Sequence, residues 1–203
     1  MEPDYRALTL SDVDRAAYVI AQAFVDDPLV ARVLPFRRTR TKTMHKFFRA
    51  FGQVSIQNGR GYGVGEPLQG VAYWKFPQQE SMSVSFRSLS IFAPLLFTFY
   101  PIGLLRAKGA LRAQEALHQK HADEPHFYLD NIGVLPGARG QRLSSRLILP
   151  VLAMADEQKT IVYTDTFLRS NVALFEHFGF HRVEERAIPG TGLTVWALRR
   201  PIQ

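Results

Sequence analysis

The feature that most constrains this chain is a strand, a glycine-containing turn and a helix that follow one another directly. Residues 126–134 (HFYLDNIGV) predict a strand, residues 135–140 (LPGARG) a turn, and an amphipathic helix is expected from about Gln141 to Gln158. A helix that starts after such a turn directs free backbone N–H groups and the positive end of its dipole toward the turn. The pattern predicts a phosphate site near Gly140, although many strand-to-helix turns contain glycine without binding phosphate.

The rest of the chain alternates between helix and strand signals. Upstream we expect a strand at 5–10, a helix capped at 11–14 and ending near 24–28, a helix at about 38–57, and a hairpin of 61–64 and 70–76. Downstream we expect a strand at 160–166, a short helix at 171–178, and a strand pair at 181–185 and 194–199. This order predicts an α/β domain with a mixed sheet.

The downstream half resembles the GNAT superfamily of acyl-CoA-dependent N-acyltransferases. The matching residues are the strand and turn at 132–144 (IGVLPGARGQRLS), followed by 171–180 (NVALFEHFGF). Within the superfamily the sequence is most similar to the puromycin N-acetyltransferase-like group, because Leu149-Pro150 lies inside the predicted helix and Ala23-Phe24-Val25-Asp26 ends the first one. The resemblance is specific over about 126–200 and loose over 1–80.

This resemblance implies a GNAT fold of the α/β (α+β) class, with a central mixed, mostly antiparallel sheet flanked by helices. A chain of 203 residues supports one core rather than two ordinary domains. We therefore expect a single domain over 1–203. Its parts are N-terminal helices and a hairpin at 1–80, a helical insertion at 81–125, and an acyl-CoA-binding core at 126–203.

The resemblance also implies which residues bind acetyl-CoA, the expected co-substrate. The strand residues Ile132, Gly133 and Val134 would offer backbone groups to the pantetheine arm, as a peptide adds to a sheet edge. Asn171 would hydrogen-bond the same arm, and the position of Phe175 would border it. The pyrophosphate would meet backbone N–H groups of the turn, which are those of Arg139, Gly140, Gln141, Arg142, Leu143 and Ser144.

Three positions depart from the family pattern. Arg142 and Ser144 stand where small residues, usually glycine, let a phosphate approach the backbone. The Arg142 side chain would either obstruct this cradle or swing outward and pair with a phosphate. Phe175 replaces the tyrosine that the family uses to protonate the leaving thiolate, and a phenyl ring has no proton to donate.

Two aspartates are candidates for the catalytic base. In the family, a deprotonated amine attacks the thioester directly, and an alkylammonium with a pKa near ~10.4 needs a base. Asp165 is the first candidate, because the related group has a carboxylate there, and Asp130 is the second. For each aspartate a structural or surface role is the alternative. The chain has no cysteine, so no thiol can hold the acetyl group.

Two functions follow as alternatives. The first is acetyl transfer from acetyl-CoA to a primary amine of a small molecule. The second is a degenerate GNAT-fold protein with weak or no CoA binding that acts as a binding or regulatory module. The three departures favour the second, but loss of a general acid typically lowers a rate by ~10²–10⁴ without abolishing catalysis.

The long apolar segment at 81–117 is expected to be helical in pieces, broken at Pro94, Pro101 and Gly103. It would either cap the core or cover an apolar ligand, and Ser90–Leu105 would wall a pocket. Its apolar run is shorter than the ~20 residues of a membrane-spanning helix. The acidic, polar N-terminus differs from a secretory signal. We therefore expect a cytoplasmic protein that does not bind membranes.

The formal net charge of +7 lies entirely in the first part of the chain. Residues 1–122 hold 16 Lys and Arg against 9 Asp and Glu, whereas 123–203 hold nine of each. The basic residues at 32–49 predict either a solvated helix face or an anion-binding surface. If this positive charge is functional, it favours an acidic acceptor or the nucleotide of CoA. We expect no nucleic acid and no metal, since neither a reading motif nor metal-ligand spacing is present. A homodimer is left open.

Overall fold

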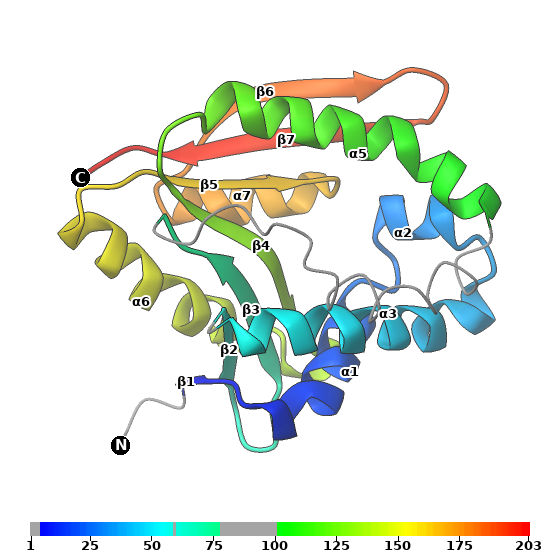
Figure 1. Cartoon of the computed structure of the whole chain (residues 1–203), viewed down its shortest axis with the longest axis horizontal. Helices are drawn as coiled ribbons and strands as arrows, with labels where there is room; N and C mark the ends of the chain where they lie inside the picture. The colour runs from blue at the N-terminus through cyan, green and yellow to red at the C-terminus, as the bar shows by residue number, and fades with distance from the viewer. Residues whose placement is uncertain (1–4, 59, 78–100) are drawn as a thin grey trace.

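A computed structural model describes residues 5–58, 60–77 and 101–203. Within these ranges the strands form one seven-stranded sheet of order β1-β2-β3-β4-β5-β7-β6 (Figure 1). All neighbouring pairs are antiparallel except β4 and β5, which are parallel. The strands are β1 (Arg6–Ala7), β2 (Gly61–Val64), β3 (Gly70–Lys75), β4 (Phe127–Val134), β5 (Val162–Thr166), β6 (His181–Ile188) and β7 (Leu193–Arg200). The predicted α/β class with a mixed, mostly antiparallel sheet is confirmed.

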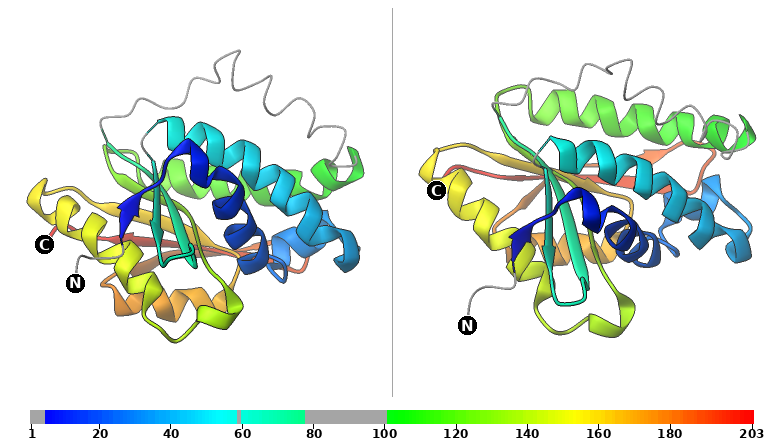
Figure 2. Two further views of the ribbon diagram at one scale, coloured as in Figure 1. Left: turned by 90° about the horizontal axis from the view of Figure 1, so that it is seen from below. Right: turned by 60° about the horizontal axis from the view of Figure 1, so that its bottom comes forward.

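Helices cover both faces of this sheet. Figure 2 shows α1, α3 and α5 on one side and α6 and α7 on the other. The helices are α1 (Val13–Ala23), α2 (Pro28–Val33), α3 (Arg37–Gln57), α5 (Pro101–His121), α6 (Leu143–Glu157) and α7 (Arg169–His177), with 3-10 turns η1 (Leu10–Asp12) and η2 (Pro136–Ala138). The described part of the molecule therefore has three layers.

Strand β4 shows how the sequence builds these layers. Phe127 and Leu129 point into the core under α6 and α7, whereas Tyr128 between them packs with Leu117 of α5 on the other face. All three side chains are buried. Full burial of a side chain of this size contributes about 1.5–3 kcal/mol, so alternation along one strand helps to fix helices on both faces.

The parallel pair β4–β5 is paired along only part of its length. Pairing ends at Leu129 opposite Thr164, yet β4 continues to Val134. On its other edge β4 has a bulge, because Asn131 pairs with Tyr73 and Leu129 with Trp74 of β3, which leaves Asp130 as the extra residue. A bulge bends its strand and increases its twist. The two strands consequently diverge past Leu129, and the β4 edge that faces β5 has no strand partner there.

Helix α2 was not predicted, and the break expected at Gly103 does not occur. The segment Asp26-Asp27-Pro28 was expected only to end a helix, but it also starts α2. Asp27 Oδ1 accepts hydrogen bonds from the Leu29 and Val30 N–H groups, and Pro28 occupies the first helical position. Gly103 does not interrupt α5, which runs from Pro101 to His121.

Other predicted elements occur with shifted ends. The first strand is only two residues long, because Thr9 N–H donates to Asp12 Oδ2 and starts η1. Helix α6 starts at Leu143 rather than Gln141, since Gly140 and Arg142 have left-handed φ values of 81° and 58°. Pro150 lies inside it, as expected. Helix α7 starts at Arg169, so Asn171 lies in its first turn rather than at its start.

Part of the predicted helical insertion falls outside the described residues. This applies to the expected break at Pro94 and to most of the expected pocket wall at Ser90–Leu105. In the described ranges, no helix is both long and apolar enough to cross a lipid bilayer.

Candidate active site

A cavity of about 360 Å³ lies where β4 and β5 diverge. Its lining includes Phe47 of α3, on one face of the sheet, and Phe175 of α7, on the other. Since helices on opposite faces line one cavity, it passes through the gap between the two strands. A sheet opened in this way offers both a ligand space and unpaired backbone groups.

Asp165, the first candidate base, lies on β5 in the wall of this cavity. Gln114 of α5 donates a hydrogen bond from Nε2 to Asp165 Oδ1 at 2.6 Å, and the Tyr128 hydroxyl donates to Oδ2 at 3.2 Å. Burial raises the pKa of Asp165 to about 7, although both hydrogen bonds act in the opposite direction. A carboxylate with a pKa near neutrality is suited to accept a proton at the pH of the cell.

Asp130, the second candidate, lies in the same wall but in a different electrostatic setting. It occupies the bulge of β4, and its Oδ2 is 3.0 Å from Lys75 Nζ. The Asn131 side chain donates to its other oxygen at 3.3 Å. Because an ammonium already neutralises Asp130, the geometry favours Asp165 as the base. Asp130 and Lys75 also line a second, adjoining cavity of about 560 Å³.

The predicted phosphate loop forms an open turn before α6. Around Gly140, where φ is 81°, a Cβ atom would meet no atom within 4 Å. The side chains of Arg139, Gln141 and Arg142 are exposed, and Arg142 makes no side-chain hydrogen bond as the N-cap of α6. The first N–H groups of a helix lack intrahelical partners. The loop thus has an unfilled cradle, which fits a pyrophosphate, and the Arg142 side chain does not point into the core.

The strand residues expected to contact the pantetheine lie on the open edge. Ile132, Gly133 and Val134 pair with β3 and lie beyond the point where pairing with β5 ends. Ile132 also lines the cavity. Leu143 is buried and Ser144 half-buried in the first turn of α6. The edge and the loop are therefore continuous along one side of the gap, as an extended cofactor requires.

Asn171 and Phe175 both line the cavity from α7. The Asn171 side chain donates to Thr166 Oγ1 at 3.2 Å, which holds it at the end of β5. Phe175 is 2% exposed, and its ring lies 5.7 Å from that of Phe180. Phe175, which stands where the family resemblance implies a proton donor, thus packs as a core residue.

The fold brings two further residues to this site that were not predicted from the sequence. Asp27 lines the cavity from the connection between α1 and α2, and Gln114 contacts the candidate base from α5. Asp27 was available as the N-cap signal of an Asp-Pro pair. Gln114 had no local signal, because its contact with Asp165 depends on how α5 packs on β5.

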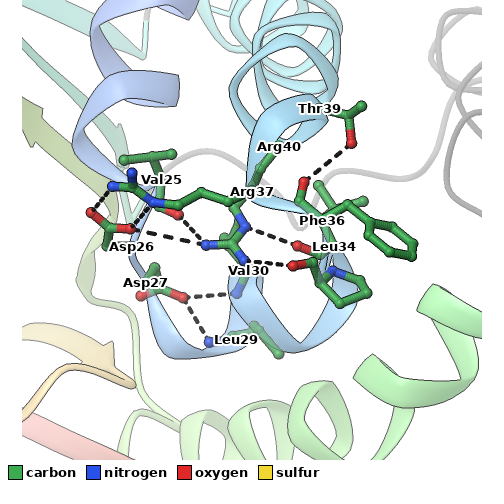
Figure 3. Close-up of polar contacts among 11 residues, drawn as sticks. Val25, Asp26, Asp27, Leu29, Val30, Leu34, Phe36, Arg37, Thr39 and Arg40 are labelled. Carbon is green, nitrogen blue, oxygen red and sulfur yellow. Dashed lines mark hydrogen bonds and ion pairs between the residues drawn. The ribbon is translucent and has the colours of Figure 1, made fainter.

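The basic residues at 32–49 are largely occupied by contacts within the chain. Arg37 pairs with Asp26, and Arg49 lies 3.7 Å from Asp14. The buried Arg40 donates to the carbonyl oxygens of Val25, Leu34 and Pro35 (Figure 3). These contacts favour a solvated helix face, with some of its bases held in contacts within the chain, over an anion-binding surface. In the described ranges, no three His, Asp or Glu side chains are placed to hold a metal ion.

Comparisons with known proteins agree with this geometry. A family model described as the acetyltransferase (GNAT) family matches residues 96–180. The fold is similar to that of a solved structure described as histone acetyltransferase HPA2 and related acetyltransferase from Corynebacterium glutamicum, with 20% identity, a TM-score of 0.68, and coverage of 100% of this chain and 98% of that one.

Two insect enzymes share the fold at lower identity. One is the polyamine N-acetyltransferase of Drosophila melanogaster, with 13% identity, a TM-score of 0.65 and coverage of 98% and 99%. The other is arylalkylamine N-acetyltransferase 2 of Aedes aegypti, with 13% identity, a TM-score of 0.63 and coverage of 98% of both chains. The family model thus matches the part of the chain that contains β4, the turn and α6, and the solved structures share the fold over nearly the whole chain.

Proposed function

We propose that the protein is an acyl-CoA-dependent N-acetyltransferase that transfers an acetyl group directly to a primary amine of a small molecule. The observation that carries the proposal is the cavity through the β4–β5 gap with Asp165, a carboxylate of near-neutral pKa, in its wall. The family match and the amine-acetylating enzymes that share the fold support it.

Bound acetyl-CoA would supply the acetyl group as a reactive thioester. The exposed loop from Arg139 to Arg142, with the start of α6, would hold its pyrophosphate through backbone N–H groups. The open edge of β4 at Ile132 and Val134 would hold the amide-containing arm, and Asn171 would border it. Acetyl-CoA held by these residues would have its thioester at the gap between the strands.

Asp165 would then act on the acceptor amine. The acceptor ammonium would first lose one proton to Asp165, which leaves a neutral amine. As that nitrogen attacks the thioester carbonyl carbon, a C–N bond forms and the C–S bond breaks, and the second proton that the nitrogen loses goes to the leaving thiolate or to water. A free ammonium with a pKa near ~10.4 is a much weaker acid than a carboxyl group of pKa about 7. The apolar part of the wall acts to lower the pKa of a bound ammonium, whereas the carboxylates in the same wall act to raise it.

The sulfur leaves without a hydroxyl group at Phe175 to protonate it. A thiol has a reference pKa near ~8.5, so its thiolate is a tolerable leaving group at neutral pH. The proton on Asp165 is available to the thiolate or to water, which restores the base. We therefore expect catalysis at a reduced rate rather than none.

Calorimetric titration with acetyl-CoA and a thiol-release assay with a panel of primary amines test the proposal. We expect saturable acetyl-CoA binding and amine-dependent thiol release. The absence of acetyl-CoA binding at millimolar concentration would overturn the proposal.

The second candidate function, a GNAT-fold module with weak or no CoA binding, is favoured by the buried phenyl ring of Phe175. Under this alternative, the double variant Arg142→Gly, Phe175→Tyr gains CoA affinity or thiol release that the wild type lacks. The puromycin N-acetyltransferase-like subgroup, a cytoplasmic location and the absence of nucleic-acid partners stay predictions. The oligomeric state, including a homodimer, is left open.

A further inference from the structure

The wall of the cavity in the β4–β5 gap is largely apolar and contains several phenylalanine rings. Its rings come from three places, the C-terminal end of α1, one face of α3, and the segment from β5 to α7. They are Phe24, Phe47, Phe48, Phe51, Phe167 and Phe175. Such a wall binds an apolar body and excludes water, which leaves charged groups in it poorly solvated.

The charged side chains of the described wall all belong to one type. They are the carboxylates of Asp27, Asp130 and Asp165, and no described Lys, Arg or His lines this cavity. Lys75 neutralises Asp130 from the adjoining cavity. Asp27 and Asp165 therefore remain as acidic groups without an ion-pair partner among the described residues. The other polar side chains of the wall are neutral, namely Gln114, Asn131, Thr164, Thr166 and Asn171.

Asp27 is held in place by the backbone around it. Its Oδ1 caps α2 through Leu29 N–H at 2.9 Å and Val30 N–H at 3.1 Å, and burial raises its pKa. These contacts, visible in Figure 3, use one carboxylate oxygen. The other oxygen makes no hydrogen bond with a described residue, and a ligand N–H group would compensate its desolvation.

We infer that this cavity binds the acceptor and selects an apolar primary amine that has no carboxylate, with Asp27 as a specificity-determining residue. The inference rests on the proposed function. A single ammonium is attracted by the two unpaired carboxylates, and the aromatic wall accepts an apolar body. The carboxylate of an α-amino acid would be repelled by both aspartates and would lose its hydration. The net charge of +7 favoured an acidic acceptor, whereas the acidic wall of the cavity favours a cationic amine.

A pair of ligands that differ in one carboxylate tests the selection. We would titrate the protein with 2-phenylethylamine and with phenylalanine by calorimetry, with and without saturating CoA. The amine is expected to bind ~100-fold more tightly, because like-charge contact across a binding site costs several kcal/mol. Equal affinities, tighter binding of phenylalanine, or no binding of the amine would overturn the inference.

A second pair tests the number of cationic groups. Hexylamine should bind at least as tightly as 1,6-diaminohexane, because the inference has Asp27 and Asp165 share one ammonium and leaves only neutral side chains and the Lys75-paired Asp130 for a second one. Tighter binding of the diamine would overturn the monoamine assignment. Direct binding measurements also separate this inference from the proposed function. Amine binding without acetyl-CoA binding or thiol release would contradict the proposed function. Turnover of phenylalanine in preference to the amine would contradict the inference.

Matched variants of two adjacent aspartates test the role of Asp27. Asp27→Asn keeps the helix cap, because asparagine caps as well as aspartate, and it is expected to weaken 2-phenylethylamine binding about tenfold while acetyl-CoA affinity stays the same. Asp26→Asn is the control, since Asp26 is exposed, pairs with Arg37 and does not line the cavity. Equal amine affinities of the two variants would rule out the role of Asp27.

Discussion

Two carboxylates in one cavity wall differ in their chemistry because of their neighbours. Asp165 is surrounded by neutral donors, the amide of Gln114 and the hydroxyl of Tyr128, so burial dominates and raises its pKa to about 7. Asp130 faces the ammonium of Lys75 instead. In the proposed mechanism, the choice of Asp165 over Asp130 as the base therefore follows from contacts made by α5, β3 and β4 rather than from the aspartates themselves.

The Asp165→Asn variant separates these roles. We expect kcat to fall by ~10²–10⁴, the usual contribution of a general base, with acetyl-CoA affinity unchanged because Asp165 does not belong to the phosphate loop. Steady-state kinetics and calorimetry measure the two quantities. Asp130→Asn is the matched variant, and a larger loss of kcat there would assign the base to Asp130.

Gln114 is expected to position Asp165 and tune its pKa. Its Nε2 hydrogen bond stabilises the ionised carboxylate, so Gln114→Leu should raise the pKa of Asp165 further and move the acidic limb of the kcat/KM pH profile to higher pH. The other groups that act on Asp165 stay in place, namely Tyr128, Asp130 and Lys75.

Gln119 provides the control for this variant, since it lies on the same helix and donates to Glu115 at the surface. Gln119→Leu should leave the pH profile of the wild type unchanged. A Gln114→Leu enzyme with reduced kcat but an unshifted profile would show a purely structural role.

At the scale of elements, α6 is bounded at both ends by non-glycine residues in left-handed conformations. Arg142, its N-cap, has φ 58°, and Lys159, just beyond its last turn, has φ 49°. This conformation costs an L-residue with a Cβ about 1–2 kcal/mol, whereas glycine adopts it freely but loses more entropy on folding.

Both Arg142→Gly and Lys159→Gly should therefore stabilise the protein, each by about 0.5–1 kcal/mol. Urea denaturation measures the gain. The two variants should differ in acetyl-CoA affinity: Arg142→Gly removes a cation beside the phosphate loop and weakens binding, whereas Lys159→Gly at the far end of α6 does not. Tighter binding by Arg142→Gly would indicate that the arginine obstructs the cradle.

The corner between α1, α2 and α3 depends on one buried cation. Arg40 donates to the carbonyls of Val25, Leu34 and Pro35 and thereby fixes the connection that carries Asp27. Arg40→Met leaves these acceptors unsatisfied and should destabilise the protein by about 2–4 kcal/mol, with a higher KM for the amine. In the control Arg37→Met, an exposed ion pair is lost, and stability and KM should not change.

The sequence predicts elements well where the signal is local and fails where the signal is tertiary. The strand at 126–134 and the turn after it have the expected form, since alternation and Leu135-Pro136 act on neighbouring residues. Gly103 was expected to break a helix, but α5 continues through it; glycine costs a helix only about 1 kcal/mol relative to alanine, which packing can offset. The overlooked α2 did have a local signal.

For the site, the same distinction separates the predicted residues from the missed ones. Asp165 and Asn171, which both line the cavity, could be predicted as candidates because the family resemblance fixes their distance from the turn. Asp27 and Gln114 reach the cavity from segments 138 and 51 positions away from Asp165 along the chain, and no spacing rule connects them. The acidic character of the cavity is likewise invisible in a chain whose net charge is +7.

At the scale of the whole molecule, the gap that creates the site also has a cost in stability. Dividing β4 from β5 past Leu129 removes ladder hydrogen bonds from the centre of the sheet and places acidic groups in an apolar space. Active sites commonly combine such unfavourable features, which the remaining fold must offset. The stability of this protein should therefore depend on the ionisation of its cavity.

The pKa of Asp165 determines whether the free energy of unfolding rises or falls with pH. Its pKa is raised from 3.8 in the unfolded chain to about 7 in the folded protein, so the folded state binds the proton more tightly. Its contribution is fully present below pH 3.8 and is lost as the pH rises through about 7. Between pH 5 and pH 8 the loss is about 3 kcal/mol, at 1.36 kcal/mol per pKa unit. His118, whose pKa burial lowers to about 4, has the opposite slope.

Comparison with the Asp165→Asn variant isolates this contribution, because His118 and all other groups titrate in both proteins. The free energy of unfolding, measured by urea denaturation at pH 5 and pH 8, should shift in favour of the variant by about 3 kcal/mol over this interval. The variant would thus gain stability relative to the wild type as the pH rises, while it is the less active protein. A difference between the two proteins that stays constant with pH would show that Asp165 is ionised in the folded state at pH 5, and it would remove the basis for its role as a base of near-neutral pKa.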